Sequence, residues 1–299
     1  MEKYYKPSGQ FSPLAPIYLL IASVTVFPLL GLIYSYAIWY IPFIYINVLI
    51  TGACGFAIGF IVDRSAIRLG KVRNNALAML LALVGGFVAC YFQWVVWVDL
   101  AINISDSVGG SRIGFSISNI KLDEVLTLAA DPALVVSLIS EINAVGTWGL
   151  AGGAVSGIFL TIIWIIEAVI LLGIPVLMAS KASKKPFSES TNNWMKEKNA
   201  GAFAFITEPH QLVANLEGGN FNELKEIPRA ETTSADHSSF TLYFSENSEY
   251  CLTITNKKAK LNDKGKLEFD EVTLVEYFWL DRDLARFLLQ EPVLQKQEA

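Results

Sequence analysis

Four apolar segments, each long enough to cross a lipid bilayer, constrain this chain more than any other feature of its sequence. A bilayer core about 30 Å thick needs roughly 20 mostly apolar residues in a helix. The segments that meet this requirement are residues 17–39, 42–62, 76–98 and 149–178. The first is longer than the apolar part of a signal peptide and lacks a small-residue cleavage site, so we expect it to stay in the protein. The sequence therefore predicts four transmembrane helices.

Charged residues are concentrated after the last of these segments. The chain is 53% hydrophobic and 17% charged, and most of its Lys, Arg, Asp and Glu residues follow residue 179. An apolar excess of this size is not typical of a soluble protein, so it belongs to the first part of the chain. The predicted fold class is an α-helical membrane bundle followed by a small α+β soluble domain.

The predicted boundaries divide the chain into four parts. These are an N-terminal segment (1–16), a transmembrane domain (17–178) with an outer loop (99–147), a linker (179–200) and a soluble domain (201–299). In the soluble domain, β-branched and aromatic runs at 240–244, 250–255, 259–261 and 267–278 are separated by turn residues, which predicts an antiparallel β-meander. Helical patterns occupy 208–217, 222–226 and 282–290.

Basic residues in the short loops predict the orientation. The loop between the second and third spans contains Arg64, Arg68, Lys71 and Arg73, whereas residues 99–147 are mainly acidic. Because Lys and Arg are enriched in cytoplasmic loops, we expect residues 63–73 and both termini to lie in the cytoplasm. Tyr and Trp residues gather near the opposite ends of the spans, as in an interfacial aromatic belt.

Glycines at four-residue spacing predict close helix packing. Gly55 and Gly59 lie in the second span, and Gly149, Gly153 and Gly157 follow each other at the start of the predicted fourth span. Small residues at this spacing let two membrane helices approach closely. We expect both faces to pack within one protomer, and a homo-oligomer formed through them is the alternative.

Glu167 is the candidate functional residue of the membrane part. It lies deep in the predicted fourth span, and no Lys, Arg or His in any span is available as its counter-ion. Because an isolated charge in the bilayer is costly, Glu167 should be protonated or paired with polar groups such as Asn47, Thr51 or Tyr45. It either binds or relays a cation or proton, or it donates an interhelical hydrogen bond that fixes the helix register.

Motifs for catalysis, cofactors and metals are missing from the sequence. His210 and His237 have no Cys or His neighbours at ligand spacing, and no nucleotide-binding or nucleophile motif occurs. Asp270, Glu271 and Glu276 form either a carboxylate cluster or an ordinary solvated strand face. The net charge of −5 disfavours nucleic acid as a partner. We therefore predict no catalytic residues, no cofactor and no metal.

Four stretches, at residues 36–45, 70–74, 146–148 and 164–168, carry a resemblance to other proteins. In these stretches the chain resembles an uncharacterised family of bacterial four-span inner-membrane proteins with a C-terminal cytoplasmic domain. In such proteins a Pro-Phe pair after the last span is often followed by two cysteines, whereas this chain has Pro186-Phe187 followed by residues without cysteine. The resemblance implies a multi-pass protein of the bacterial inner membrane, without thiol or metal chemistry at this position, and it implies no activity.

The leading functional hypothesis is a non-enzymatic, membrane-anchored interaction module with a role in signalling or assembly. Its partners are then the lipid bilayer, an unidentified cytoplasmic protein and, in the alternative above, further copies of the chain. The second hypothesis is a small ion or proton channel or transporter that uses Glu167. A membrane enzyme that uses the carboxylates at 270, 271 and 276 is the third.

Overall fold

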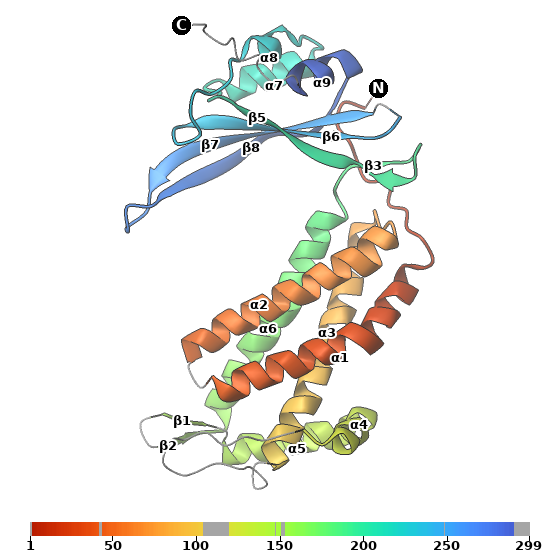
Figure 1. Ribbon diagram of the computed structural model, residues 1–299, viewed down its shortest axis with the longest axis vertical. Helices are drawn as coiled ribbons and strands as arrows, with labels where there is room; N and C mark the ends of the chain where they lie inside the picture. The colour runs from red at the N-terminus through yellow and green to blue at the C-terminus, as the bar shows by residue number, and fades with distance from the viewer. Residues whose placement is uncertain are drawn as a thin grey trace, which may run out of the picture. The chain divides into compact units, whose positions relative to one another are not determined.

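The protein consists of two compact units, each described here by itself (Figure 1). The structure is a computed structural model that describes residues 2–41, 44–103, 120–146, 148–150, 153–247 and 249–289. The membrane unit comprises residues 8–184, and the C-terminal domain comprises residues 1–7 together with 185–299. The predicted start of the second span, at residue 42, lies outside the described residues.

Four long helices build the membrane unit, as the sequence predicts. They are α1 (Ala15–Tyr40), α2 (Ile44–Val62), α3 (Asn75–Ile102) and α6 (Ile158–Ala182). Each is long and apolar enough to cross a membrane. Large apolar side chains remain exposed on all four helices, as expected when lipid rather than water surrounds them. The chain is a multi-pass membrane protein.

Glycines set the distances between these helices. A Cβ atom at Gly31 of α1 would lie 2.8 Å from the backbone nitrogen of Gln93 in α3. Gly55 and Gly59 of α2 face α6, where added Cβ atoms would lie 3.1 Å from the Ile170 carbonyl oxygen and 2.5 Å from the Met178 sulfur. These pairs of helices therefore approach closely, with backbone nearest to Gly31 and Gly55 and the Met178 side chain nearest to Gly59.

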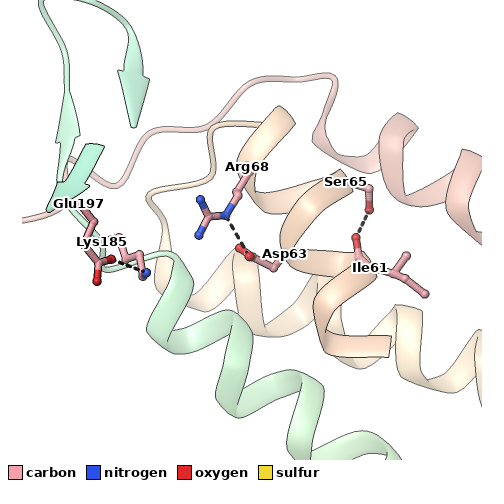
Figure 2. A network of polar contacts seen from close by, with 6 residues as sticks. All are labelled: Ile61, Asp63, Ser65, Arg68, Lys185 and Glu197. Carbon is pink, nitrogen blue, oxygen red and sulfur yellow. Dashed lines mark hydrogen bonds and ion pairs between the residues drawn. The ribbon is translucent and has the colours of Figure 1, made fainter. Parts of the chain in front are cut away.

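The second span continues into a π-helix, η1 (Asp63–Leu69). A π-helix repeats i→i+5, so Arg68 lies over Asp63, and its Nε donates to Asp63 Oδ2 at 2.9 Å (Figure 2). The Ser65 hydroxyl bonds the Ile61 carbonyl at 2.6 Å, where the helix type changes. We call the end of the bundle that contains residues 63–73 and 181–184 the basic end.

Two short helices and a hairpin connect α3 to α6. They are α4 (Leu122–Ala130), α5 (Pro132–Val145), β1 (Trp148–Leu150) and β2 (Gly153–Val155). Helices α4 and α5 bend by 107° at Asp131, and they would be a fifth crossing if the pair counted as one broken span. Leu128 and Val135 are buried against Val95, Trp97 and Val98 of α3. The pair is packed onto the end of the bundle.

The start of the fourth span differs from the prediction. Gly149 and Gly153 lie in the β1–β2 hairpin, and α6 begins only at Ile158. Gly157 precedes the helix with a φ of 62°, and nothing lies within 4 Å of an added Cβ atom. A left-handed residue cannot continue an α-helix, so these three glycines form no helix-packing face.

A four-stranded antiparallel sheet forms the centre of the C-terminal domain. Its strand order is β5-β6-β7-β8. The predicted meander is present, but the predicted runs 250–255 and 259–261 form one continuous strand, β7 (Tyr250–Leu261), and an additional strand, β5, pairs with β6. The elements are β3 (Phe187–Ser188), β4 (Asn193–Trp194), β5 (Lys196–Ala204), α7 (Pro209–Glu217), α8 (Asn222–Glu226), β6 (His237–Phe244), β7 (Tyr250–Leu261), β8 (Leu267–Leu280) and α9 (Arg282–Leu289). The predicted linker, 179–200, thus contains the end of α6 and the strands β3, β4 and half of β5.

Helices α7, α8 and α9 lie on the same side of this sheet (Figure 1). Leu212, Leu224 and Leu284 from the three helices pack against Phe240 and Ile254 of the sheet. We call the opposite side the open face. It has a smaller cluster of Met195, Tyr243 and Cys251, joined by Tyr5, Tyr277 and Trp279.

Residues 3–5 extend the sheet beside β8. The Tyr5 amide donates to the Tyr277 carbonyl at 2.8 Å, and the Trp279 amide donates to the Lys3 carbonyl at 2.9 Å. The Tyr4 hydroxyl donates to Glu217 at 2.9 Å, and burial followed by this carboxylate raises the Tyr4 pKa to about 12. Residues 3–5 therefore belong to the same compact unit as β8.

Candidate functional site

Glu167 faces polar groups from the other spans rather than a uniformly apolar surface. Its carboxyl interacts electrostatically with the Tyr34 hydroxyl of α1 and the Cys90 thiol of α3. Tyr34 is 2% exposed, and Glu167 itself is partly buried. Within the described part of the chain, the Glu167 carboxyl accepts or donates no hydrogen bond. The site therefore places a carboxyl near polar groups without fixing it by a direct bond.

A directed chain of hydrogen bonds leads from Tyr34 into α2. The Thr51 hydroxyl donates to the Asn47 carbonyl at 2.8 Å, and Thr51 and Tyr34 are joined by a second bond of 2.8 Å. A hydroxyl has one hydrogen, so Tyr34 must donate to Thr51. The Tyr34 oxygen then has only acceptor capacity left. A neighbouring carboxylate is unfavourable beside such an acceptor, whereas a protonated carboxyl or a bound cation is favourable.

The three predicted partners of Glu167 have different positions. Thr51 is completely buried, and its hydroxyl is bonded to Tyr34 rather than to Glu167. Asn47 has a buried side-chain oxygen without a hydrogen-bond partner among the described residues. Tyr45 is 86% exposed, so its side chain does not point into the bundle. The sequence did not identify Tyr34 and Cys90, because the rotation of each helix about its axis decides which polar residues face inward.

A second polar cluster holds α4 against the end of α3. Asp99 is fully buried, and its carboxylate accepts from the Asn103 amide at 3.2 Å and from the Lys121 backbone at 3.1 Å. Asn103 also donates to Glu124 at 2.9 Å. Each of these groups is bonded to another group of the same cluster, so we interpret the cluster as a structural contact between α3 and α4. The sequence analysis missed it.

The titratable residues of the C-terminal domain do not assemble into a reactive site. Glu271 pairs with Lys257 at 2.8 Å, and Asp270 pairs with Lys260. Because consecutive strand residues point to opposite faces, Asp270 and Glu271 are separated by the sheet. His237 is 5% exposed and its Nδ1 contacts the Ala235 carbonyl at 2.8 Å, while His210 is exposed on α7. Among the described residues, no group of His, Cys, Asp and Glu is arranged to hold a metal ion.

Comparisons with protein-family models, with curated proteins and with solved structures found no match for this chain.

Proposed function

We propose that this chain is a bacterial inner-membrane protein whose four spans anchor a cytoplasmic interaction domain, with a role in signalling or assembly. The basic end of the bundle supports this orientation, because Arg64, Arg68, Lys71, Lys181 and Lys184 lie there. The connector at the other end is mainly acidic. Since residues 1–7 and 185–299 form one domain, that domain follows the basic end into the cytoplasm.

The observation that carries the proposal is the open face of the sheet. The three helices cover the other side, and the central part of the open face presents Ser239, Thr241, Thr253, Thr255 and Thr273. These are strand positions whose short hydroxyl side chains give a flat, uncharged surface. An antiparallel sheet can leave one face in water, and such a face is then available to a partner.

Exposed apolar residues adjoin this surface at the end of the β7–β8 ribbon. The pairing of β6 with β7 ends at Lys257, which pairs with the first residue of β6. From there to the turn at residues 262–266, β7 pairs only with β8. Leu261 and Leu267 are cross-strand partners there, and they are 71% and 38% exposed. Large apolar side chains at the tip of a solvated ribbon are typical of protein contacts. The proposed partner is therefore a cytoplasmic protein with an apolar site.

Site-specific photocrosslinking in native membranes tests this proposal. A photoreactive residue at Thr253 or Leu261 of the full-length protein is expected to give one discrete crosslinked product. The same residue at Glu226, which is exposed on α8 of the covered side, serves as the matched control. The captured protein must then bind the purified chain, and Leu261→Asp with Leu267→Asp should weaken that binding at least tenfold. Equal crosslinking from both sides of the sheet contradicts the proposal.

A second candidate function, conduction or transport of a cation or proton, is favoured by the position of Glu167. The carboxyl of α6 lies within electrostatic range of the Tyr34 hydroxyl of α1 and the Cys90 thiol of α3. Ionisable groups that face the interior of a membrane bundle often mark ion or proton pathways. The Tyr34 hydroxyl, which donates to Thr51, keeps only acceptor capacity for a protonated carboxyl or a cation at this place.

Flux measurements in proteoliposomes separate the two candidates. If Glu167 carries the activity, Glu167→Gln abolishes cation or proton flux, because an amide neither binds a cation by charge nor exchanges a proton. Tyr45→Phe is the control, since Tyr45 is exposed and should leave flux unchanged. Wild-type vesicles without flux, or equal flux in the Glu167→Gln variant, reject conduction through Glu167 and leave a structural role for it.

A further inference from the structure

Four cations at the basic end have no carboxylate partner within the part of the chain that the structure describes. Asp63 is the acidic residue of this end, and Arg68 already occupies its Oδ2. Arg73 turns inward, where its Nε donates to Ser8 at 3.0 Å. The remaining cations are Arg64, Lys71, Lys181 and Lys184, and none of them forms an ion pair with a carboxylate of the described residues.

Two of these cations follow directly after rows of exposed apolar side chains on α2 and α6. Phe56 and Phe60 of α2 are 59% and 46% exposed, and Arg64 follows four residues later on the same face. The Arg64 guanidinium lies 5.1 Å from the centre of the Phe60 ring. On α6, Leu177 is 65% exposed and Lys181 follows it at the same spacing. Each helix therefore changes from an apolar to a cationic surface within one turn.

Exposed apolar side chains also continue beyond these cations. Leu69, at the end of η1, is 59% exposed, and Phe11 and Leu14, just before α1, are 47% and 48% exposed. The amide of Ser12 donates to the Gly70 carbonyl at 2.8 Å, which holds this segment beside the end of η1. Arg64 and Lys181 thus lie beside exposed apolar groups, at the level where acyl chains would meet headgroups in a bilayer.

We propose that Arg64, Lys71, Lys181 and Lys184 form a binding surface for the headgroups of anionic phospholipids. Helices α2 and α6 adjoin each other through Gly55 and Gly59, so Arg64 and Lys181 end rows on neighbouring helices. An acyl chain that lies along Phe60 or Leu177 brings its phosphate to the level of these cations. The proposal requires that the four helices cross a bilayer, and it does not depend on the function of the C-terminal domain.

The surroundings of the cations favour a lipid over a soluble anion. A soluble phosphate or a nucleic acid would neutralise the cations but would not cover the apolar side chains beside them. Phe60, Leu69 and Leu177 would stay exposed next to such a ligand. A phospholipid covers the apolar groups and neutralises the charges at the same time. Each Lys or Arg near an anionic membrane surface adds about 1 kcal/mol, which corresponds to roughly a fivefold preference per cation.

Association of spin-labelled lipids with the reconstituted full-length protein tests this inference. Phosphatidylglycerol is expected to associate more tightly than phosphatidylcholine, and the difference should shrink as salt is raised. In the double variant Arg64→Gln and Lys181→Gln, the preference for phosphatidylglycerol should be roughly 25-fold weaker than in the wild-type protein, because each of the two lost cations contributes about fivefold. The charge-matched control is Lys198→Gln with Lys258→Gln, two exposed lysines of the C-terminal domain, and it should keep the preference.

Three results would overturn the inference. The first is an equal association of the two lipids with the wild-type protein, which needs no variant and is independent of any folding defect. The second is equal stabilisation of the detergent-solubilised protein by inorganic phosphate and by phosphatidylglycerol, which would assign the cations to a soluble anion. An equal loss of preference in the control pair also contradicts it, because the effect would then follow from net charge.

Discussion

Replacement of Gly31 by leucine is expected to separate α1 from α3 and to destabilise the membrane unit by about 2–3 kcal/mol. Even the first added atom would lie 2.8 Å from Gln93 N and 3.0 Å from the Phe92 carbonyl carbon, both of which are backbone atoms. Backbone cannot rotate away as a side chain can, so the helices must move apart. The same movement would break the 2.8 Å bond from the buried Ser35 hydroxyl to the Gln93 carbonyl.

A denaturant titration in mixed micelles measures this loss, and Gly173→Leu is the matched control. Gly173 is also inside a membrane helix, but nothing lies within 4 Å of a Cβ atom added there. The control should therefore unfold at or above the wild-type midpoint, since leucine is a better helix former than glycine. Equal stability of the two variants would show that α1 and α3 are not in backbone contact at Gly31.

Replacement of Asn256 by alanine is expected to cost the C-terminal domain about 2–3 kcal/mol, because it leaves buried polar groups without partners. Three bonds form a closed ring: Ser238 to the Asn256 side-chain oxygen at 2.6 Å, Asn256 to the Ile206 carbonyl at 2.8 Å, and the Ile206 amide to Ser238 at 3.1 Å. Ser238 is completely buried, and Asn256 is 7% exposed. Water therefore cannot readily replace the lost amide.

The thiol of Cys251 provides the measurement for this variant. Cys251 is completely buried in β7, and burial followed by the charge of Glu249 raises its pKa, so alkylation requires unfolding. Peptide-resolved alkylation in increasing urea gives the midpoint in the full-length protein. Thr255→Ala, one residue away on the open face, should shift this midpoint little. Wild-type behaviour of Asn256→Ala would show that the ring contributes nothing to stability.

The parts of the fold that could be predicted are those that depend on local pattern. Apolar length alone identified the four spans, and the alternation in residues 240–278 identified the meander. The glycine-rich stretch before α6 was misassigned because composition does not distinguish a hairpin from a helix; the left-handed φ at Gly157 does. Strand β5 was missed because its charged first half has no strand-like pattern, and it is ordered by pairing with β6.

The candidate site shows the same limit at the level of single residues. Glu167 could be identified from the sequence because its depth in the membrane follows from its position along a single helix. Its neighbours cannot be counted in this way, since they depend on how α1 and α3 rotate around close contacts such as that at Gly31. The Asp63–Arg68 pair was equally hidden, because five-residue spacing brings side chains together in a π-helix and not in an α-helix.

The pairing of residues 3–5 with β8 also bears on biosynthesis. These residues are translated long before β8, so the edge of the sheet stays open while all four spans are inserted. Completion of the sheet joins segments very distant in sequence, which makes it a late and slow step. If one span failed to insert, residues 3–5 and β8 would lie on opposite sides of the bilayer and could not pair. The finished sheet therefore forms only when residues 3–5 and β8 lie on the same side of the membrane.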